Sequence, residues 1–208
     1  STAAFSGFGG PKAMVESSEG GANMLMGIGI NTGGYNYRAV GVKWMANADS
    51  YMNDVKFVGG HGGLWKPKPG VEEPRGRWNR PARISSPDNP VAASGMDLAW
   101  DNQYWSLWVT NNGGGTFKDI WTASTYATNG FYANNTSTPG RIYAMSIEHH
   151  VRNEVRFSKV SNWKVYCMQT EEESRESTDC QPIEMDDCKD VTFANLYICL
   201  LYTSPSPR

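Results

Sequence analysis

A short phrase ending in phenylalanine recurs along this chain. Its copies are Asp54-Val55-Lys56-Phe57, Gly115-Thr116-Phe117, Glu154-Val155-Arg156-Phe157 and Asp190-Val191-Thr192-Phe193. Their phenylalanines are 60, 40 and 36 residues apart. A phrase that returns every ~20–50 residues is typical of a solenoid, whose repeats bury their apolar faces against one another. Because each copy alternates apolar and polar residues, the repeat predicts strands along one wall of an all-β, right-handed parallel β-helix.

Further strand-like runs separate the copies, at 24–30, 39–45, 104–110, 141–147, 163–168 and 182–185. The last two intervals each hold the phrase strand, a second strand, a turn-rich loop and a third strand, which predicts a single-stranded solenoid with three strands per coil. No run keeps a 3.6-residue apolar period, and this disfavours a βαβ fold. A β-sandwich is the remaining alternative, although its hairpin signals are weak.

The first interval is the longest, and its excess lies in a long loop at 59–95. The loop begins with glycine pairs around His61 and continues with six prolines and four arginines. Such a proline-rich segment cannot join the interior of a sheet, so we expect it to lie over the solenoid. Long loops of this kind often carry function, although some only cover an edge.

Both ends of the chain suggest a truncated β-helix domain spanning 1–198. The chain begins without methionine, and we expect any secretion signal to lie upstream. Residues 199–208 all match a translated sequencing-library adapter, with a linker rich in proline and serine as the alternative. Without Cys199, three cysteines remain, so no even disulfide framework is implied. A single Cys180–Cys188 bridge and buried thiols both fit the sequence.

Composition narrows the classes of partner. The net charge of −2 favours neither nucleic acid nor an anionic membrane surface, and no apolar run approaches the ~18 residues of a membrane span. Eight tryptophans and 22 glycines suit turn-rich β structure. Ordinary β packing explains most of the tryptophans, while exposed ones would offer stacking surfaces to sugar rings. A β-helix groove of this kind predicts a polysaccharide partner.

Glycosidic cleavage usually needs two carboxyl groups that flank the scissile bond. The candidates for catalysis are Glu171, Glu172, Glu173, Glu148 and Asp97. The three consecutive glutamates follow a strand and open a polar loop, where a general acid could be placed. A solvated acidic turn is the alternative for this run, and a turn cap is the alternative for Asp97.

The substrate-binding candidates are aromatic and polar residues near the long loop and the 148–154 cluster: Trp65, Trp100, Asp101, Trp105, His149 and Arg152. His149 and His150 are adjacent, so on a strand they would point to opposite faces. No third metal ligand is evident in the sequence, and we therefore expect no metal and no other cofactor. A hydrogen-bonded turn is the alternative interpretation of the 148–154 cluster.

Four segments, 51–57, 106–117, 138–155 and 163–173, resemble the pectate-lyase-like β-helix domains of family-55 glycoside hydrolases. Among them are the runs Asn111-Asn112-Gly113-Gly114-Gly115 and Glu148-His149-His150. The resemblance implies a secreted enzyme that hydrolyses β-1,3-glucan with inversion and with a glutamate as general acid. It also implies a second β-helix outside this fragment, with the substrate between the two. The general acid of that family cannot be matched to a position in this sequence.

Two other functions stay open. One is a polysaccharide lyase or a polygalacturonase-like enzyme, and a lyase would use a basic residue and often Ca²⁺. The other is a non-catalytic β-helix, such as a sugar-binding adhesin or a tail-spike module. Geometry discriminates between them, because an enzyme should place two carboxylates close together beside an aromatic-lined groove, whereas a binding module would show the aromatic residues alone.

Overall fold

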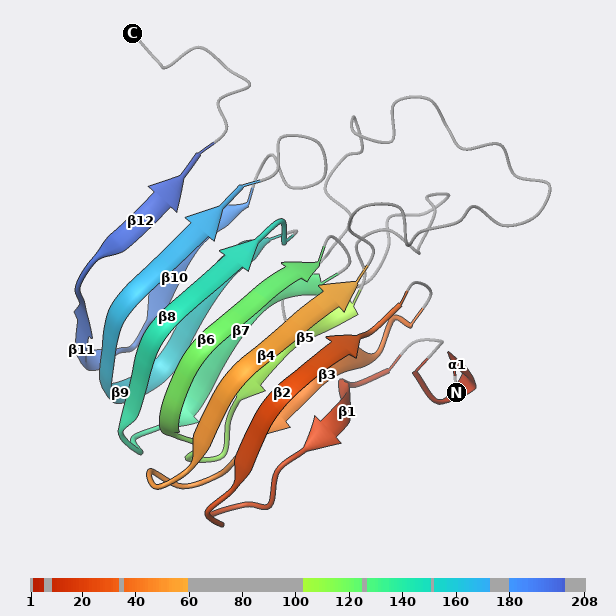
Figure 1. The fold of residues 1–208 in the computed structure, drawn as a ribbon, viewed down its shortest axis with the longest axis horizontal. Helices are drawn as coiled ribbons and strands as arrows, with labels where there is room; N and C mark the ends of the chain where they lie inside the picture. The colour runs from red at the N-terminus through yellow and green to blue at the C-terminus, as the bar shows by residue number, and fades with distance from the viewer. Residues whose placement is uncertain are drawn as a thin grey trace, which may run out of the picture.

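The computed structural model describes residues 2–5, 9–33, 36–59, 103–124, 127–150, 152–172 and 180–200. These residues form strands stacked into a solenoid, with one helical turn at the start (Figure 1). The elements are α1 (Thr2–Phe5), β1 (Lys12–Glu16), β2 (Met24–Asn31), β3 (Ala39–Trp44), β4 (Tyr51–Gly59), β5 (Gln103–Val109), β6 (Gly115–Ser124), β7 (Ala127–Thr136), β8 (Gly140–Glu148), β9 (Asn153–Glu171), β10 (Gln181–Asp186), β11 (Lys189–Phe193) and β12 (Leu196–Cys199).

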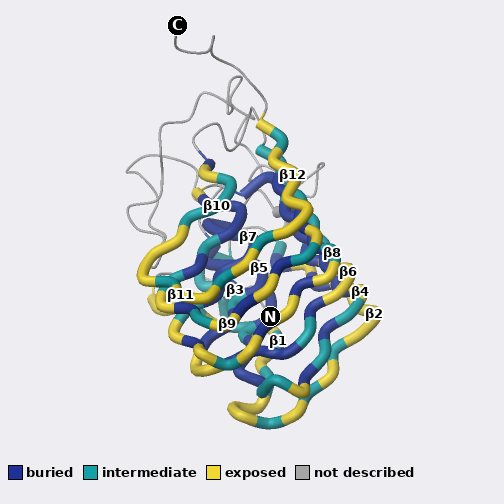
Figure 2. Tube along the Cα trace, turned by 90° about the vertical axis from the view of Figure 1, so that its left-hand side faces the viewer, coloured by how far each residue is buried: buried dark blue, intermediate teal, exposed yellow. Residues whose placement is uncertain are grey.

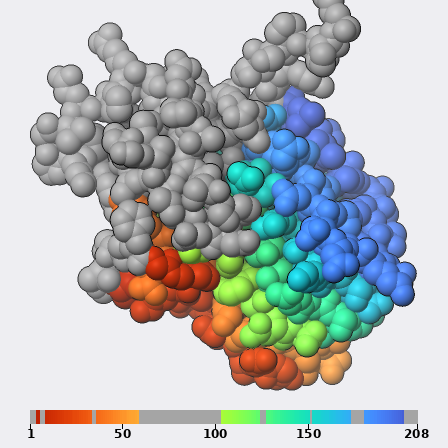
Figure 3. Space-filling model, turned by 180° about the vertical axis from the view of Figure 1, so that it is seen from behind, coloured from red at the N-terminus to blue at the C-terminus, as the bar shows by residue number. Residues whose placement is uncertain are grey.

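The strands divide into two parallel sheets. Sheet A contains β1, β3, β5, β7, the first half of β9 and β10, and sheet B contains β2, β4, β6, β8, the second half of β9, β11 and β12. Every strand pair in the described chain is parallel, so the predicted all-β parallel β-solenoid is confirmed and the β-sandwich alternative is excluded. Seen from behind, the coils follow one another in chain order (Figure 3).

The typical turn of the solenoid contains fewer residues than the 36–60 that separate copies of the recurring phrase. Along sheet A the offsets between partners are 27 (Lys12 to Ala39), 65 (Val42 to Leu107), 24 (Leu107 to Phe131), 24 (Phe131 to Val155) and 28 (Val155 to Ile183). The chain therefore makes about five turns. The 65-residue turn contains the interval between β4 and β5. The predicted loop at 59–95 falls in this interval, and except for Gly59 it lies outside the described residues.

The phrase does not mark one wall, so that prediction is wrong. Phe117 and Phe193 do share a column of sheet B, through Ile142 and Val165. Phe57 occupies a different column of sheet B, opposite Thr122, and Phe157 belongs to sheet A. All four phenylalanines point into one interior. A strand of either sheet that alternates inward and outward residues satisfies the same pattern. The phrase therefore predicts a buried phenylalanine but not which sheet the strand belongs to.

Each strand of sheet B bends at its middle, and this explains the predicted three strands per coil. The last coil holds three strands, β10, β11 and β12, whereas β11 and β12 correspond to one bent strand in the earlier coils. The bend falls on one column of left-handed residues, namely Gly27 (φ 63°), Asp54 (φ 50°), Asp119 (φ 51°), Ala144 (φ 69°) and Asn195 (φ 56°). Glycine, aspartate and asparagine adopt this conformation more readily than other residues, and they supply four of the five positions.

Aromatic rings stack through the interior of the solenoid. Trp163 is 0% exposed, and its ring lies 5.7 Å from that of Phe117, 5.9 Å from Phe131 and 5.8 Å from Phe157. The middle coils are the most deeply buried, whereas β2, β11 and β12 at the two ends are largely exposed (Figure 2). The apolar contacts that hold the coils together are therefore concentrated around Trp163.

Gly140 begins β8 directly against Trp163. A Cβ atom at Gly140 would lie 2.2 Å from Cε2 of that ring, so we expect Gly140→Ala to lower the free energy of unfolding by about 1–3 kcal/mol. Gly29 of β2 is the matched control, because a Cβ atom there meets nothing within 4 Å. Urea denaturation of both variants checks the expectation. Equal stabilities would contradict the close packing of β8 on Trp163.

The four cysteines are free thiols, so the Cys180–Cys188 bridge is not formed in this structure. Cys180 is buried, in agreement with the alternative interpretation of a buried thiol, whereas Cys167 is exposed. Among the described residues, no helix has the length and apolarity needed to cross a membrane.

Candidate functional site

The outer face of sheet B carries pairs of side chains that lie side by side, one on β8 and one on β9. Arg141 lies beside Lys164, Ser146 beside Gln169 and Glu148 beside Glu171. Between the first two pairs, the rings of Tyr143 and Tyr166 stack with their centroids 5.0 Å apart and an interplanar angle of 16°. Successive outward residues on a strand are separated by ~7 Å. A ligand lying along these two strands would therefore pass cations, aromatic rings, amide and hydroxyl groups and finally carboxylates.

A groove crosses this face where the strands bend. Its volume is about 470 Å³, and the left-handed column forms part of its lining. The lining residues are Asp54, Lys56, Asp119, Ile120, Trp121, Ala144, Met145, Ser146, Cys167, Met168, Gln169, Asn195 and Tyr197. The local backbone conformation of sheet B thus produces a concave surface that runs across several coils.

Two aromatic residues, Trp121 and Tyr197, are available along the groove. They lie in one outward column with Lys56, Ser146 and Gln169. Trp121 is half-buried and Tyr197 is 62% exposed. Aromatic faces flanked by amide, hydroxyl and ammonium groups are the surfaces to which sugar rings and their hydroxyls bind. The composition of the groove is therefore suited to a carbohydrate.

Two carboxylates lie in the next outward column, two residues further along β8 and β9. The Ser146 hydroxyl donates a hydrogen bond of 2.7 Å to Glu148 Oε1, and Gln169 Nε2 donates one of 3.4 Å to Glu171 Oε2. Glu148 is the last residue of β8, and Glu171 is the last residue of β9. Residues that line the groove thus orient both carboxylates. The solenoid brings two sequence-predicted catalytic residues together.

His149 joins these carboxylates as a third candidate ligand. Its Nε2 lies 3.7 Å from Glu171 Oε1, and one ligand atom from each of Glu148, His149 and Glu171 lies within 4.8 Å of the other two. Nitrogen and oxygen donors in this arrangement could hold a divalent cation. Sequence inspection missed the third ligand because cross-strand stacking, and not proximity in the chain, brings Glu171 to this position.

The neighbouring His150 belongs to a separate, buried network. Its Nδ1 lies 2.5 Å from Glu154 Oε2, and its Nε2 lies 3.4 Å from Ser106 Oγ. The order serine, histidine, carboxylate matches that of a nucleophile, its base and an orienting group. However, Ser106, His150 and Glu154 are only 3%, 0% and 1% exposed, so no substrate reaches them. We assign this network to the stability of the interior.

Burial changes the proton affinity of both partners in this network. Burial, assisted by the nearby His149, lowers the pKa of His150 well below its ordinary value of 6.5. Burial raises the pKa of Glu154 well above its ordinary value of 4.5, against hydrogen bonds from His150 and Cys180 that lower it. Both shifts favour the uncharged forms, a neutral imidazole and a protonated carboxyl group.

These two shifts make stability depend on pH in both directions. Above pH 6.5 the unfolded pair holds no proton, so the raised pKa of Glu154 makes stability fall as the pH rises toward the pKa of the folded carboxyl group. Below pH 4.5 the unfolded pair holds two protons, so stability falls as the pH decreases. Between pH 4.5 and 6.5 the pair holds one proton in the unfolded chain, and the two shifts have opposite effects on stability. Thermal unfolding should therefore show a maximum between pH 4.5 and 6.5.

Glu154→Gln tests this expectation, because it removes the titrating carboxyl group but keeps a side chain of similar size. The decline in melting temperature between pH 6.5 and 8 should become shallower than in the unsubstituted chain. The neighbouring Cys180 thiol does not interfere in this window, because its ordinary pKa is 9.0 and burial raises that pKa further. Parallel declines in the two proteins would show that the pair is not protonated.

The remaining predicted site residues lie elsewhere. Trp105 is 4% exposed and packs 4.6 Å from Trp108 and 4.8 Å from Tyr132, on sheet A. Arg152 is exposed and directly precedes β9, and Glu172 directly follows β9, where its amide donates to the Cys199 carbonyl. Five predicted residues lie outside the described ones: Trp65, Asp97, Trp100, Asp101 and Glu173.

Several groove residues escaped the sequence analysis, among them Lys56, Trp121, Gln169 and Tyr197. They are single polar or aromatic residues at outward positions, and nothing in their local sequence distinguishes them from other outward residues. A useful signal was present in Asp54, Asp119 and Asn195, which interrupt apolar strands with residues that tolerate the left-handed conformation. Such residues at the middle of a strand mark the bend, and therefore the groove.

Comparison with known proteins gives no further assignment: neither a protein-family model nor a curated protein matches this chain. The structure supports a parallel β-solenoid of about five turns. This fold is compatible with carbohydrate-active enzymes and with binding modules.

Proposed function

We propose that this chain is a carbohydrate-active module that binds a linear polysaccharide in the groove of sheet B. The observation that carries the proposal is the juxtaposition of that groove with the carboxylates of Glu148 and Glu171. The bend column gives the concave surface, Trp121 and Tyr197 offer stacking faces, and Ser146 and Gln169 connect the groove to the carboxylates. We include a secreted location in the proposal, because polysaccharides of this kind are mainly extracellular.

Hydrolysis is the activity that we propose for the carboxylate pair. One carboxyl group would protonate the leaving oxygen while the other attacks the anomeric carbon to form a glycosyl ester. Water, deprotonated by the first group, would then displace that ester and free the second carboxylate. The ligand atoms of Glu148 and Glu171 lie within 4.8 Å of each other. This separation is closer to the roughly 5–5.5 Å of retaining enzymes than to the roughly 6.5–9.5 Å of inverting ones. We therefore propose retention in place of the inversion that the family resemblance implies.

The experiment is a product assay on the complete chain. Laminarin is the first substrate to test, since the resemblance implies β-1,3-glucan, and pectin and xylan follow. Hydrolysis predicts new reducing ends, no ultraviolet-absorbing unsaturated product, and a retained anomeric configuration in proton NMR spectra taken during the reaction. Inverted product would contradict the assignment of Glu148 and Glu171 as a retaining pair.

A chelator separates hydrolysis by two carboxylates from a metal-dependent reaction. Glu148, His149 and Glu171 offer a ligand set, so EDTA treatment is an informative control. Activity that persists in EDTA supports the two carboxylates acting alone. Activity that is lost in EDTA and restored by a divalent cation, with unsaturated product, would instead identify a lyase.

A further inference from the structure

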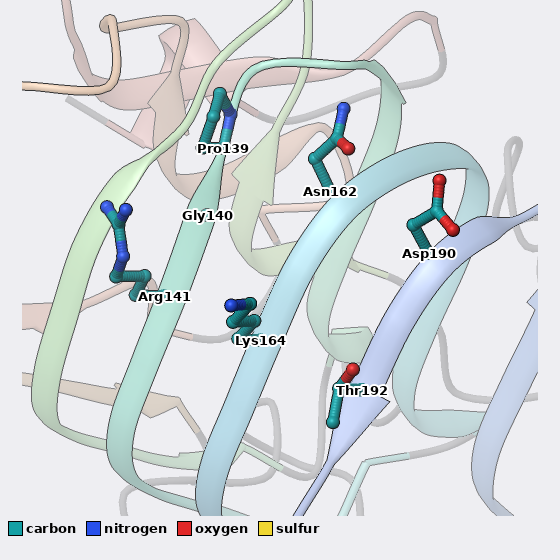
Figure 4. Close-up of a pocket in the computed structure, with 7 residues that line it drawn as sticks. All are labelled: Pro139, Gly140, Arg141, Asn162, Lys164, Asp190 and Thr192. Atoms are coloured by element: carbon teal, nitrogen blue, oxygen red, sulfur yellow. The ribbon is translucent and has the colours of Figure 1, made fainter.

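A second pocket lies on the outer face of sheet B, at the opposite end of the strands from Glu148 and Glu171. Its volume is about 390 Å³, and Figure 4 shows its lining residues on neighbouring strands. Arg141 of β8 and Lys164 of β9 are direct cross-strand partners, both exposed. Thr192 of β11 lies beside Lys164, and Thr116 of β6 lies beside Arg141. The column therefore presents hydroxyl, guanidinium, ammonium and hydroxyl groups in succession.

The two cations have no acidic partner within the described part of the chain. No described carboxylate oxygen lies within 4.0 Å of the nitrogens of Arg141 or Lys164, whereas Lys43, Lys118 and Arg156 each make an ion pair. Like charges directly opposite each other on neighbouring strands are destabilising. The chain as a whole has a net charge of −2, so a generally basic surface does not account for the pair.

An anion bound between Arg141 and Lys164 would relieve their repulsion. The guanidinium can donate two parallel hydrogen bonds to a carboxylate or sulfate, and the ammonium adds a charge-assisted bond. Asp190 lines the same pocket, with its carboxylate directed away from Lys164 (Figure 4). Its negative charge would direct an anion toward the Arg141 side.

A stacking surface adjoins these cations. Tyr143 and Tyr166 follow Arg141 and Lys164 by two residues, ~7 Å along the strands. Their rings stack at 5.0 Å, and Tyr143 is 41% exposed. An aromatic face at this distance from a cation pair matches a sugar ring that bears a negatively charged substituent.

We propose that Arg141, Lys164, Tyr143 and Tyr166 form a subsite for an acidic sugar, with the cations binding its carboxylate or sulfate. The inference rests on the proposed function in one respect, namely that the ligand is a polysaccharide. It narrows the substrate class to glycans that carry negative charge. Neutral β-1,3-glucan would leave the cations of this subsite without a partner.

Calorimetric titration of three hexasaccharides tests the subsite: laminarihexaose as the neutral probe, hexagalacturonate as the carboxylated one and a κ-carrageenan hexasaccharide as the sulfated one. We expect at least one acidic probe to bind more tightly than laminarihexaose. The variant R141Q/K164Q should weaken acidic binding at least tenfold and change laminarihexaose binding less than twofold. The two acidic probes distinguish a carboxylate from a sulfate ligand.

The control variant K12Q/K43Q also removes two positive charges, but from sheet A, and it should change none of the affinities more than twofold. Undiminished acidic binding by R141Q/K164Q, or absence of acidic binding by the unsubstituted chain, would overturn the subsite. Binding and cleavage of laminarihexaose alone would leave the proposed function standing while the subsite fails. Acidic binding that is sensitive to R141Q/K164Q, without cleavage, would support the subsite and remove the proposed hydrolysis.

Discussion

Glu171→Gln is expected to lower turnover of the cleaved polysaccharide at least about 100-fold, because general acid–base groups typically contribute a factor of ~10²–10⁴. Glu148→Gln should have a similar effect, since the two carboxylates would act on one glycosidic bond. The amide keeps the size of the side chain and can still accept the hydrogen bond that Gln169 donates to Glu171. Initial rates of reducing-end formation, with melting temperatures recorded for each variant, measure the effect.

Glu184→Gln is the matched control for these substitutions. Glu184 lies on the outer face of sheet A in an ion pair with Arg156 at 2.9 Å, away from the groove. It should retain turnover within about twofold. Full activity of both Glu148→Gln and Glu171→Gln would remove the carboxylate pair from the mechanism. Loss of activity in Glu172→Gln alone would move the assignment to the next residue of the acidic run.

Trp163→Ala is expected to lower the free energy of unfolding by about 3–5 kcal/mol, the usual cost of deleting a fully buried aromatic side chain. The ring touches three phenylalanines from both sheets, so its removal leaves a cavity that neighbouring coils cannot easily fill. This is a large part of the 5–15 kcal/mol that typically separates folded from unfolded chains. Equilibrium denaturation in urea measures the loss.

Trp121→Ala is the control of the same chemical type. Trp121 is half-buried on the outer face of sheet B, so its loss should cost about 1 kcal/mol or less. The two variants are thus expected to differ by at least about 2 kcal/mol. Similar stabilities would contradict the assignment of Trp163 to the interior and Trp121 to the groove.

The sequence was sufficient to predict the fold because its strands are strongly patterned. Runs such as 39–45 and 141–147 coincide closely with β3 and β8, and the absence of helical periodicity excluded crossover helices. The period was not predictable in the same way. Inward positions on both sheets bury apolar residues equally well, so Phe57 and Phe157 produce the same local phrase from different sheets.

The candidate site was predictable only in part. The 148–154 cluster and the glutamate run were recognised as polar groups at strand ends. Glu148 and Glu171 lie side by side because one turn of the solenoid at this point spans 23 residues, and neither segment alone indicates that length. The groove itself arises from left-handed residues at the middle of sheet B. Its position became evident only once Asp54, Asp119 and Asn195 were seen to lie in one column.

The most direct test of the central claim is the affinity of the unsubstituted chain and of Trp121→Ala for the polysaccharide that gives products in the assay above, measured by isothermal titration calorimetry. Stacking on an aromatic face together with the area that it buries is worth about 1.4 kcal/mol or more, equivalent to tenfold in affinity. The account predicts saturable binding by the unsubstituted chain and at least tenfold weaker binding by Trp121→Ala, whose stability falls by no more than about 1 kcal/mol. Equal affinities of the two proteins would contradict binding in the groove of sheet B.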